Sequence, residues 1–126
     1  MLEVAPKKRK WERGLLFLLI FVIVGVTGRI YFIQQDLHKQ EQLRYELMIL
    51  RSAVNTYKIV EKKTPASLLN LFSETYTLPG TDNQQYYARQ MTVENGGQVL
   101  DPFGHPYKFE PETGWISSST RKYAAW

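Results

Sequence analysis

The chain of 126 residues contains no cysteine. Disulfide bonds, thiolate zinc sites and thiol redox chemistry are therefore excluded as sources of stability or function. The sequence also lacks a nucleophile with a nearby base, a glycine-rich phosphate loop and a paired-histidine zinc motif. We therefore expect no enzymatic activity and no cofactor. The length suits one small domain with one appended segment.

Positive charge is concentrated at the beginning of the chain. The net charge is +4, and residues 1–14 carry Lys7, Lys8, Arg9, Lys10 and Arg13 against Glu3 and Glu12. A nucleic-acid-binding domain presents a basic stripe across a folded face. The remainder of the chain offers no such stripe, so we expect no nucleic-acid partner.

An apolar run follows the basic cluster. Every residue from Leu15 to Val26 is apolar except Gly25. With Ile30–Ile33 the run reaches the roughly 20 residues that a membrane-spanning helix needs, provided that Arg29 snorkels to the headgroups. A buried core helix is the alternative, but a helix that is apolar all round needs a larger protein around it. We predict a transmembrane helix over residues 15–33.

The flanks of this run indicate its topology. Lysine and arginine stay on the cytoplasmic side of a membrane, so residues 1–14 are predicted to be a cytoplasmic leader. The same rule explains the PKKRK stretch better than a nuclear-localisation signal does. A cleaved signal peptide would end in small residues of the A-x-A type, whereas this run ends in VTGRIYF. We expect the helix to be retained.

The helix is predicted to continue beyond the membrane. No glycine or proline interrupts residues 29–63, and apolar residues recur on one helical face: Ile33, Leu37, Leu43, Leu47, Leu50, Val54 and Tyr57. We predict one helix from Leu15 to about Lys62, roughly 48 residues or about 70 Å long. A coiled-coil stalk is the alternative, but the heptad pattern is short and imperfect. We expect residues 34–126 to form a head that covers the amphipathic half.

The remaining residues predict a short helix and a small antiparallel sheet. Thr64 is expected to cap the helix, with Pro65 as its first residue; Tyr76–Gly80 ends it, and Thr81–Gln85 is a polar loop. Strands are expected at Ala88–Val93, Tyr107–Phe109 and Trp115–Ser118, with turns at Glu94–Gly97, Asp101–Gly104 and Pro111–Gly114. The predicted fold class is α+β.

Several parts of the sequence resemble type IV pilins and type II secretion pseudopilins. They are a basic leader ending in Gly14, an apolar segment continuing into a long helix, and the stretches LRSAVNTYKIVEKKTPASLLNLF (50–72) and LDPFGHPYKFEPETGWISS (100–118). The last is similar to the family's Leu-Asp-Pro-Trp-Gly-Asn-Pro-Tyr turn. The turn residues here are Leu100, Asp101, Pro102, Phe103, Gly104, His105, Pro106 and Tyr107, with Phe103 and His105 in place of Trp and Asn.

The resemblance implies a pilin-like fold and a structural function in a type II secretion or type IV pilus-type system. The protein would lie in the bacterial inner membrane with a periplasmic head. Its partners would be other pilin-like subunits, inner-membrane assembly proteins and a prepilin peptidase that cuts between Gly14 and Leu15. Gly25 and Gly28 are candidates for close helix packing, because small residues let helices approach in lipid.

Two departures from the family pattern matter. The fifth residue of the mature chain is usually a glutamate that takes part in assembly, and here it is Leu19. No carboxylate follows Glu112, so we expect no calcium site of the kind that major pseudopilins carry. Leu19 favours an alternative function, an uncleaved single-pass adaptor whose periplasmic head binds one envelope partner without forming a filament.

Other polar and aromatic residues are expected to have structural roles. His38 is interpreted as a solvated helix residue, His105 as a turn filler and Asp101 as a turn cap. The hydroxyl run Ser117–Thr120 is interpreted as edge-strand polarity. Tyr76, Tyr86 and Tyr87 form either an exposed contact patch or part of the core, and the sequence leaves this open.

Overall fold

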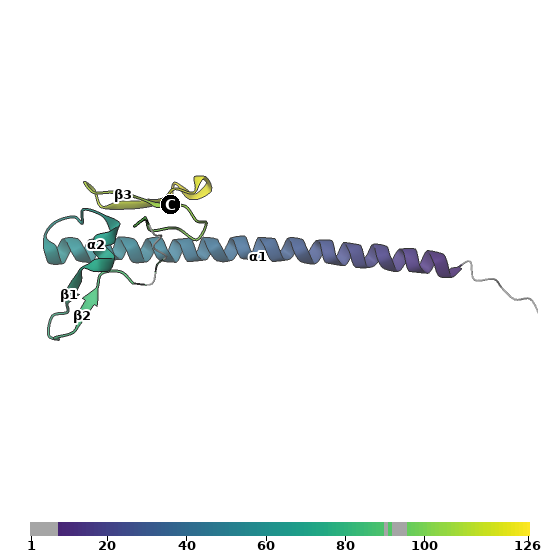
Figure 1. Cartoon of the computed structure of the whole chain (residues 1–126), viewed down its shortest axis with the longest axis horizontal. Coiled ribbons are helices and arrows are strands. Elements are labelled where there is room, and N and C mark those ends of the chain that lie inside the picture. Colours follow the sequence, from purple (N-terminus) through teal and green to yellow (C-terminus); the bar gives the residue numbers. More distant parts are fainter. Residues whose placement is uncertain (1–7, 90, 92–95) are drawn as a thin grey trace, which may run out of the picture. The chain divides into compact units, whose positions relative to one another are not determined.

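A computed structural model describes residues 8–89, 91 and 96–126. It divides into two compact units, Met1–His38 and Lys39–Trp126. The element order is α1 (Lys8–Glu61), α2 (Leu68–Ser73), β1 (Thr75–Thr77), β2 (Gln84–Tyr86), β3 (Tyr107–Glu110), β4 (Trp115–Ser118) and the 3₁₀ turn η1 (Arg121–Tyr123). The predicted α+β class is confirmed at this level (Figure 1).

Helix α1 is uninterrupted over 54 residues and passes through Arg29 without a break. It begins at Lys8, earlier than the expected Leu15, so the end of the basic leader is helical. Lysine, arginine and glutamate are good helix formers, and the single Gly14 costs only about 1 kcal/mol in a helix interior. The helix ends at Glu61, one residue before the expected end, because Lys62 adopts a left-handed conformation with φ 57°.

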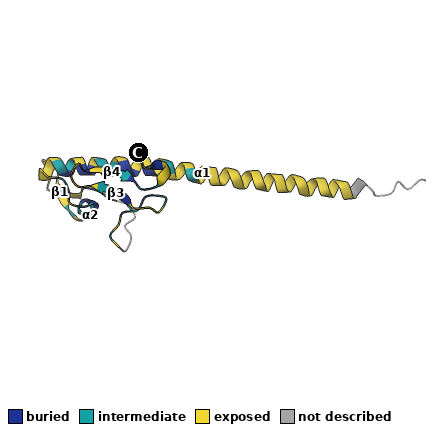
Figure 2. Ribbon diagram, turned by 90° about the horizontal axis from the view of Figure 1, so that it is seen from above, coloured by how far each residue is buried: buried dark blue, intermediate teal, exposed yellow. Residues whose placement is uncertain are grey.

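The core of the second unit forms along one face of α1. Buried residues of α1 recur after every three or four positions and so share one helix face: Leu43, Glu46, Leu47, Leu50, Ala53, Val54 and Tyr57. This buried stripe is visible in Figure 2. Side chains from the rest of the unit pack on it, among them Leu68, Leu71, Val99 and Ile116. The expected coverage was wrong at Leu37, which is 53% exposed and belongs to the first unit. Ile33, at the end of the predicted transmembrane segment, is 54% exposed.

The strands form two small sheets instead of the single sheet expected. Strand β1 pairs antiparallel with β2, with Tyr76 opposite Gln85, and β3 pairs antiparallel with β4, with Phe109 opposite Ile116. Figure 1 shows α2 and these sheets beside the part of α1 that belongs to the second unit. The expected strands at Tyr107–Phe109 and Trp115–Ser118 are confirmed.

The segment between α1 and β2 differs from the expectation. The N-cap position of α2 is Ser67 instead of Thr64, and the Ser67 side chain makes no capping hydrogen bond. Pro65 lies before the helix and is fully buried. Strand β1 occupies the place where we expected the end of the helix, and β2 occupies part of the expected polar loop. All three β2 residues are exposed, so this strand has no alternation of polar and apolar residues for sequence analysis to detect.

The expected strand Ala88–Val93 is wrong where the structure describes it. Ala88 is buried outside any strand, and its N–H donates to the carbonyl of Leu71 at 2.9 Å. Residues 90 and 92–95, which include the first two residues of the expected turn Glu94–Gly97, lie outside the described residues.

The two later turns are confirmed. The Gly104 N–H donates to the Asp101 carbonyl at 2.9 Å, and the Gly114 N–H donates to the Glu110 carbonyl at 2.7 Å. Both glycines have positive φ, 83° and 75°. They differ in their surroundings: a Cβ at Gly104 would meet nothing within 4 Å, whereas one at Gly114 would come within 2.9 Å of Val54 Cγ1.

This difference predicts unequal effects of the same substitution. Gly104→Ala should lower the free energy of unfolding by about 1–2 kcal/mol, the cost of a left-handed alanine. Gly114→Ala should cost about 1–3 kcal/mol more, because it also crowds Val54 and the Lys58 side chain. Urea unfolding of the detergent-solubilised chain measures both values. Equal losses would contradict the close packing of the turn between β3 and β4 on α1.

Candidate functional site

Among the described residues, one helix, Lys10–Glu61, is long and apolar enough to cross a membrane. The large apolar side chains from Leu15 to Ile33 are all more than half exposed, with Phe21 at 81%. Figure 2 shows this continuous exposure along α1. A contiguous apolar surface of this size is unfavourable in water. The segment is therefore compatible with a membrane anchor.

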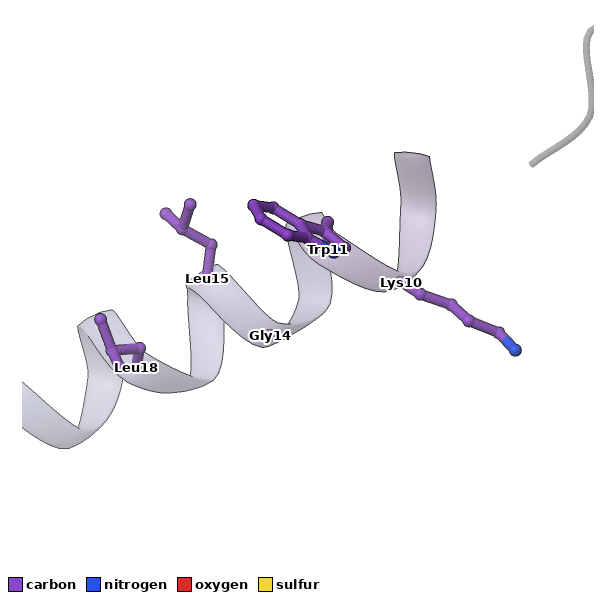
Figure 3. A pocket seen from close by; sticks show the side chains of 5 residues that line it. All are labelled: Lys10, Trp11, Gly14, Leu15 and Leu18. Atoms are coloured by element: carbon purple, nitrogen blue, oxygen red, sulfur yellow. The ribbon is translucent and has the colours of Figure 1, made fainter. Parts of the chain in front are cut away.

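The proposed processing site lies inside this helix. Gly14 is flanked on the helix surface by Lys10, Trp11, Leu15 and Leu18, as Figure 3 shows, with the Lys10 side chain pointing away from the apolar ones. A Cβ at Gly14 would meet nothing within 4 Å. The bond between Gly14 and Leu15 is thus in helical conformation.

The two packing candidates share one side of α1. Gly25 and Gly28 are three residues apart, which places them on the same helix face. A Cβ at either position would meet nothing within 4 Å. The fold of this chain therefore does not require glycine at these positions, and the close approach that they allow is available to a second helix.

The family-like turn is built around the carboxylate of Asp101, whose side chain is fully buried. Its Oδ1 accepts hydrogen bonds from the backbone N–H groups of Phe103 (3.0 Å) and His105 (2.9 Å). Its Oδ2 accepts from the hydroxyls of Ser118 (2.8 Å) and Thr120 (2.6 Å). The turn cap is confirmed, and the same carboxylate also ties the turn to the end of β4.

These contacts determine the ionisation of Asp101. Burial alone would raise the pKa of the carboxyl group, but the hydrogen bonds from Thr120, His105, Ser118 and Phe103 together outweigh burial. The pKa of Asp101 is therefore lowered from its usual value. The interpretation of Ser117–Thr120 as edge polarity is wrong for Ser118, which is completely buried and bonded to Asp101.

His105 does more than fill the turn. Thr120 Oγ1 has a single hydrogen, which it donates to Asp101. His105 Nδ1 lies 3.0 Å from the same oxygen, so Nδ1 must carry the hydrogen of this second bond. The imidazole thus reinforces the link between the turn and the residues that follow β4.

The other turn residues have simpler positions. Leu100 is half-buried and forms an isolated antiparallel bridge with Pro106, whose carbonyl accepts from Ser119 Oγ at 2.5 Å. Pro102 is half-buried in the turn itself. The Phe103 ring stacks on Tyr123 with centroids 5.1 Å apart.

Tyr107 connects the turn to α1. Its hydroxyl donates to Glu46 Oε2 at 2.6 Å, and Gln42 donates to the other oxygen of Glu46 at 2.8 Å. Burial, this hydrogen bond and the nearby charge of Glu46 all raise the pKa of Tyr107. Sequence analysis missed Glu46; the available signal was an acidic residue between the apolar stripe positions Leu43 and Leu47.

Arg51 connects α1 to β4. Its Nε and Nη2 donate to the carbonyl of Ile116 at 3.1 and 2.8 Å, and its guanidinium lies over the Trp115 ring, 4.1 Å from the centroid. Sequence analysis missed this contact as well. Arg51 and Ile116 are 65 residues apart in the chain, so no local sequence pattern indicates this contact.

The three tyrosines divide between the two interpretations. Tyr87 is buried, and its ring centroid lies 4.7 Å from that of Tyr76 and 4.9 Å from that of Tyr57. Tyr76 and Tyr87 therefore belong to the core. Tyr86 is 45% exposed. Burial and a hydrogen bond to Glu74 raise the pKa of Tyr57 to about 12. Burial and a hydrogen bond to Glu61 raise the pKa of Tyr87 to about 12.

The histidines and carboxylates do not gather into a metal centre in the part of the chain that the structure describes, where no three such side chains lie together. His38 is exposed on α1, as expected. The expectations of no calcium site and no catalysis stay predictions.

Comparison with known proteins gave no match to a family model, to a curated protein or to a solved structure. The resemblance of residues 50–72 and 100–118 to pilins and pseudopilins therefore stays a prediction from the sequence. The geometry itself establishes an α+β chain with one helix compatible with a membrane anchor.

The Asp101 contacts predict loss of stability in acid. Because the pKa of Asp101 is lower in the folded chain than in the unfolded one, its contribution is complete above the usual carboxyl pKa and is lost as the pH falls below it. Asp101→Asn should cost about 1.5–3 kcal/mol at neutral pH, as for loss of hydrogen bonds to a charged group, and should flatten the acid limb of the stability curve. Thermal unfolding between neutral and acidic pH measures both effects. As a control, Asp82→Asn, an exposed loop position, should change neither. An unchanged acid limb in Asp101→Asn would contradict the assignment.

Proposed function

We propose that this protein is a pseudopilin-like structural subunit of a type II secretion or type IV pilus-type system. Residues 15–33 anchor it in the bacterial inner membrane, with the basic leader in the cytoplasm and the head in the periplasm. Its function is mechanical instead of enzymatic: the apolar helix packs among similar helices, and the head packs against neighbouring heads and inner-membrane assembly proteins.

The observation that carries this proposal is the continuity of α1. One unbroken helix supplies both the exposed apolar segment and the buried stripe on which the α/β elements are built. A signal sequence or a separate anchor would not need to share its helix with the core of the head. A pilin-like subunit does need this, because its membrane helix is also the spine of its head.

The Asp101 turn gives further support. The aspartate, glycine and tyrosine of this turn are shared with the pilin and pseudopilin pattern that the sequence resembles. Each of the three has a distinct structural role in this chain. Asp101 accepts four hydrogen bonds, Gly104 supplies a positive φ, and Tyr107 bonds to α1 through Glu46. The motif therefore fastens the sheet elements of a head onto a long helix.

The adaptor remains the second candidate function, and two observations favour it. Leu19 stands where the family's assembly glutamate is expected. The bond between Gly14 and Leu15 lies within α1, whereas proteolytic sites are typically in flexible segments. Gly14 weakens the helix locally, so cleavage after local unwinding is physically feasible.

The mature N-terminus distinguishes the two functions. If the protein is a processed subunit, mass spectrometry of the membrane-extracted chain should find Leu15 as the first residue, and Gly14→Leu should leave the leader attached. Val26→Leu, a conservative change farther along the helix, should be processed normally. A chain that retains residues 1–14 in the presence of the secretion machinery would contradict processing and favour the adaptor.

Assembly through the glycine face predicts a pattern of cross-links. Because the chain has no cysteine, single introduced cysteines report on one position each. Phe32→Cys lies on the side of α1 that carries Gly25 and Gly28, and Ile30→Cys lies on the opposite side. Under mild oxidation in membranes, Phe32→Cys should form disulfide dimers several-fold more efficiently than Ile30→Cys. Gly25→Leu should remove this preference. Equal cross-linking of both positions would contradict packing through the glycine face.

A further inference from the structure

The second unit carries a cationic and aromatic surface that neither the anchor nor the Asp101 turn uses. Its centre is an open hollow of about 210 Å³ lined by Arg44, Leu47, Arg51 and Trp126. We name these four residues the arginine hollow. Pockets for whole cofactors are larger, about 300 Å³ or more, so the hollow suits a single side chain.

Both guanidinium groups of the hollow are held in place by aromatic rings. Arg44 lies over the Trp126 ring, 4.4 Å from its centroid, and Arg51 lies over Trp115 at 4.1 Å. Arg51 is fixed further by its two hydrogen bonds to the Ile116 carbonyl. An arginine has five N–H donors in a planar fork, so Arg51 keeps donors for another group. Fixing the fork in advance reduces the entropy lost on binding.

The positive charge of the hollow is not neutralised within the described residues. Among the ion pairs recorded for the described residues, none joins Arg44 or Arg51 to a carboxylate. The buried carboxylate on the same part of α1, Glu46, is engaged by Gln42 and Tyr107. Lys39, over the Phe103 ring at 5.8 Å, adds a further positive charge to this unit.

We propose that the arginine hollow is a binding site for a carboxylate side chain on an acidic segment of a partner protein. The two arginines receive the carboxylate through charge-assisted hydrogen bonds. Leu47 and Trp126 form an apolar wall for the neighbouring part of the segment. A hollow that two arginines line, one of them fixed by hydrogen bonds, suits a single localised carboxylate better than a diffuse charged surface. This site does not depend on whether the protein forms a filament or acts as an adaptor.

The test uses the full chain in neutral-detergent micelles and two synthetic peptides. One peptide alternates glutamate and leucine, and the other replaces each glutamate with glutamine. NMR signals of the arginine Nε–H groups and the Trp126 indole N–H report binding at the hollow. The acidic peptide should shift these signals and bind at least about tenfold more tightly than the neutral one, a difference of about 1.4 kcal/mol. Equal binding of the two peptides would overturn the proposal.

Variants locate the site and separate it from folding. Arg44→Gln should weaken acidic-peptide binding at least about tenfold. Because Arg44 is exposed and its recorded contact is the stacking on Trp126, the melting temperature of the variant should stay close to that of the parent chain. Lys108→Gln, which removes an exposed charge on β3, should bind like the parent. Arg51→Gln is secondary, because it also removes the bond to Ile116. Unchanged binding by a folded Arg44→Gln variant would overturn the proposal.

An anionic lipid headgroup is the competing ligand. Glycerol phosphate serves as its soluble probe. If glycerol phosphate shifts the same signals with an affinity that falls in Arg44→Gln, while the acidic peptide does not bind, the hollow is a headgroup site and the protein-partner proposal is wrong. Binding of the peptide with little response to glycerol phosphate supports it.

Discussion

The buried stripe of α1 from Leu43 to Tyr57 is the constraint on which the head depends. The two sheets have strands of three or four residues, and two-stranded sheets of this size are not stable alone in water. Helix α2 has six residues, which is also too few for an isolated helix. Each buried leucine of the stripe contributes about 1.5–3 kcal/mol through its removal from water. The short elements persist because they share this one surface, in a chain without disulfide bonds.

Polar contacts determine how the short elements are aligned on that surface. Burial against a helix is not directional, so an apolar stripe alone would allow β3 and β4 to slide along α1. The bond from Tyr107 to Glu46 and the bonds from Arg51 to the Ile116 carbonyl fix one position on each strand. Removing either partner would leave a buried polar group unsatisfied, which is costly. Asp101 then fixes the turn against the end of β4.

The parts of the fold that sequence analysis predicted are those determined by local chemistry. Strands β3 and β4 were located because their turns contain aspartate, proline and glycine at positions with specific backbone requirements. Strands β1 and β2 were missed because β2 is exposed throughout and has no alternating pattern. Asp101 was recognisable as a cap from its turn. Its bonds to Ser118 and Thr120, and the partners of Glu46 and Arg51, join residues far apart in the chain, and no local signal reports such contacts.

The described part of the chain presents at least two surfaces that its own fold does not use. The face at Gly25 and Gly28 has open space where side chains would be, and the arginine hollow has no carboxylate partner among the described residues. The first suits contact between helices in lipid, where small residues allow close packing. The second suits contact in water, where charge complementarity guides recognition. A filament subunit would use the glycine face in every copy, whereas a solitary adaptor needs only a contact on its head. The two candidate functions therefore differ in whether the glycine face is occupied, and occupation of the hollow alone is compatible with both.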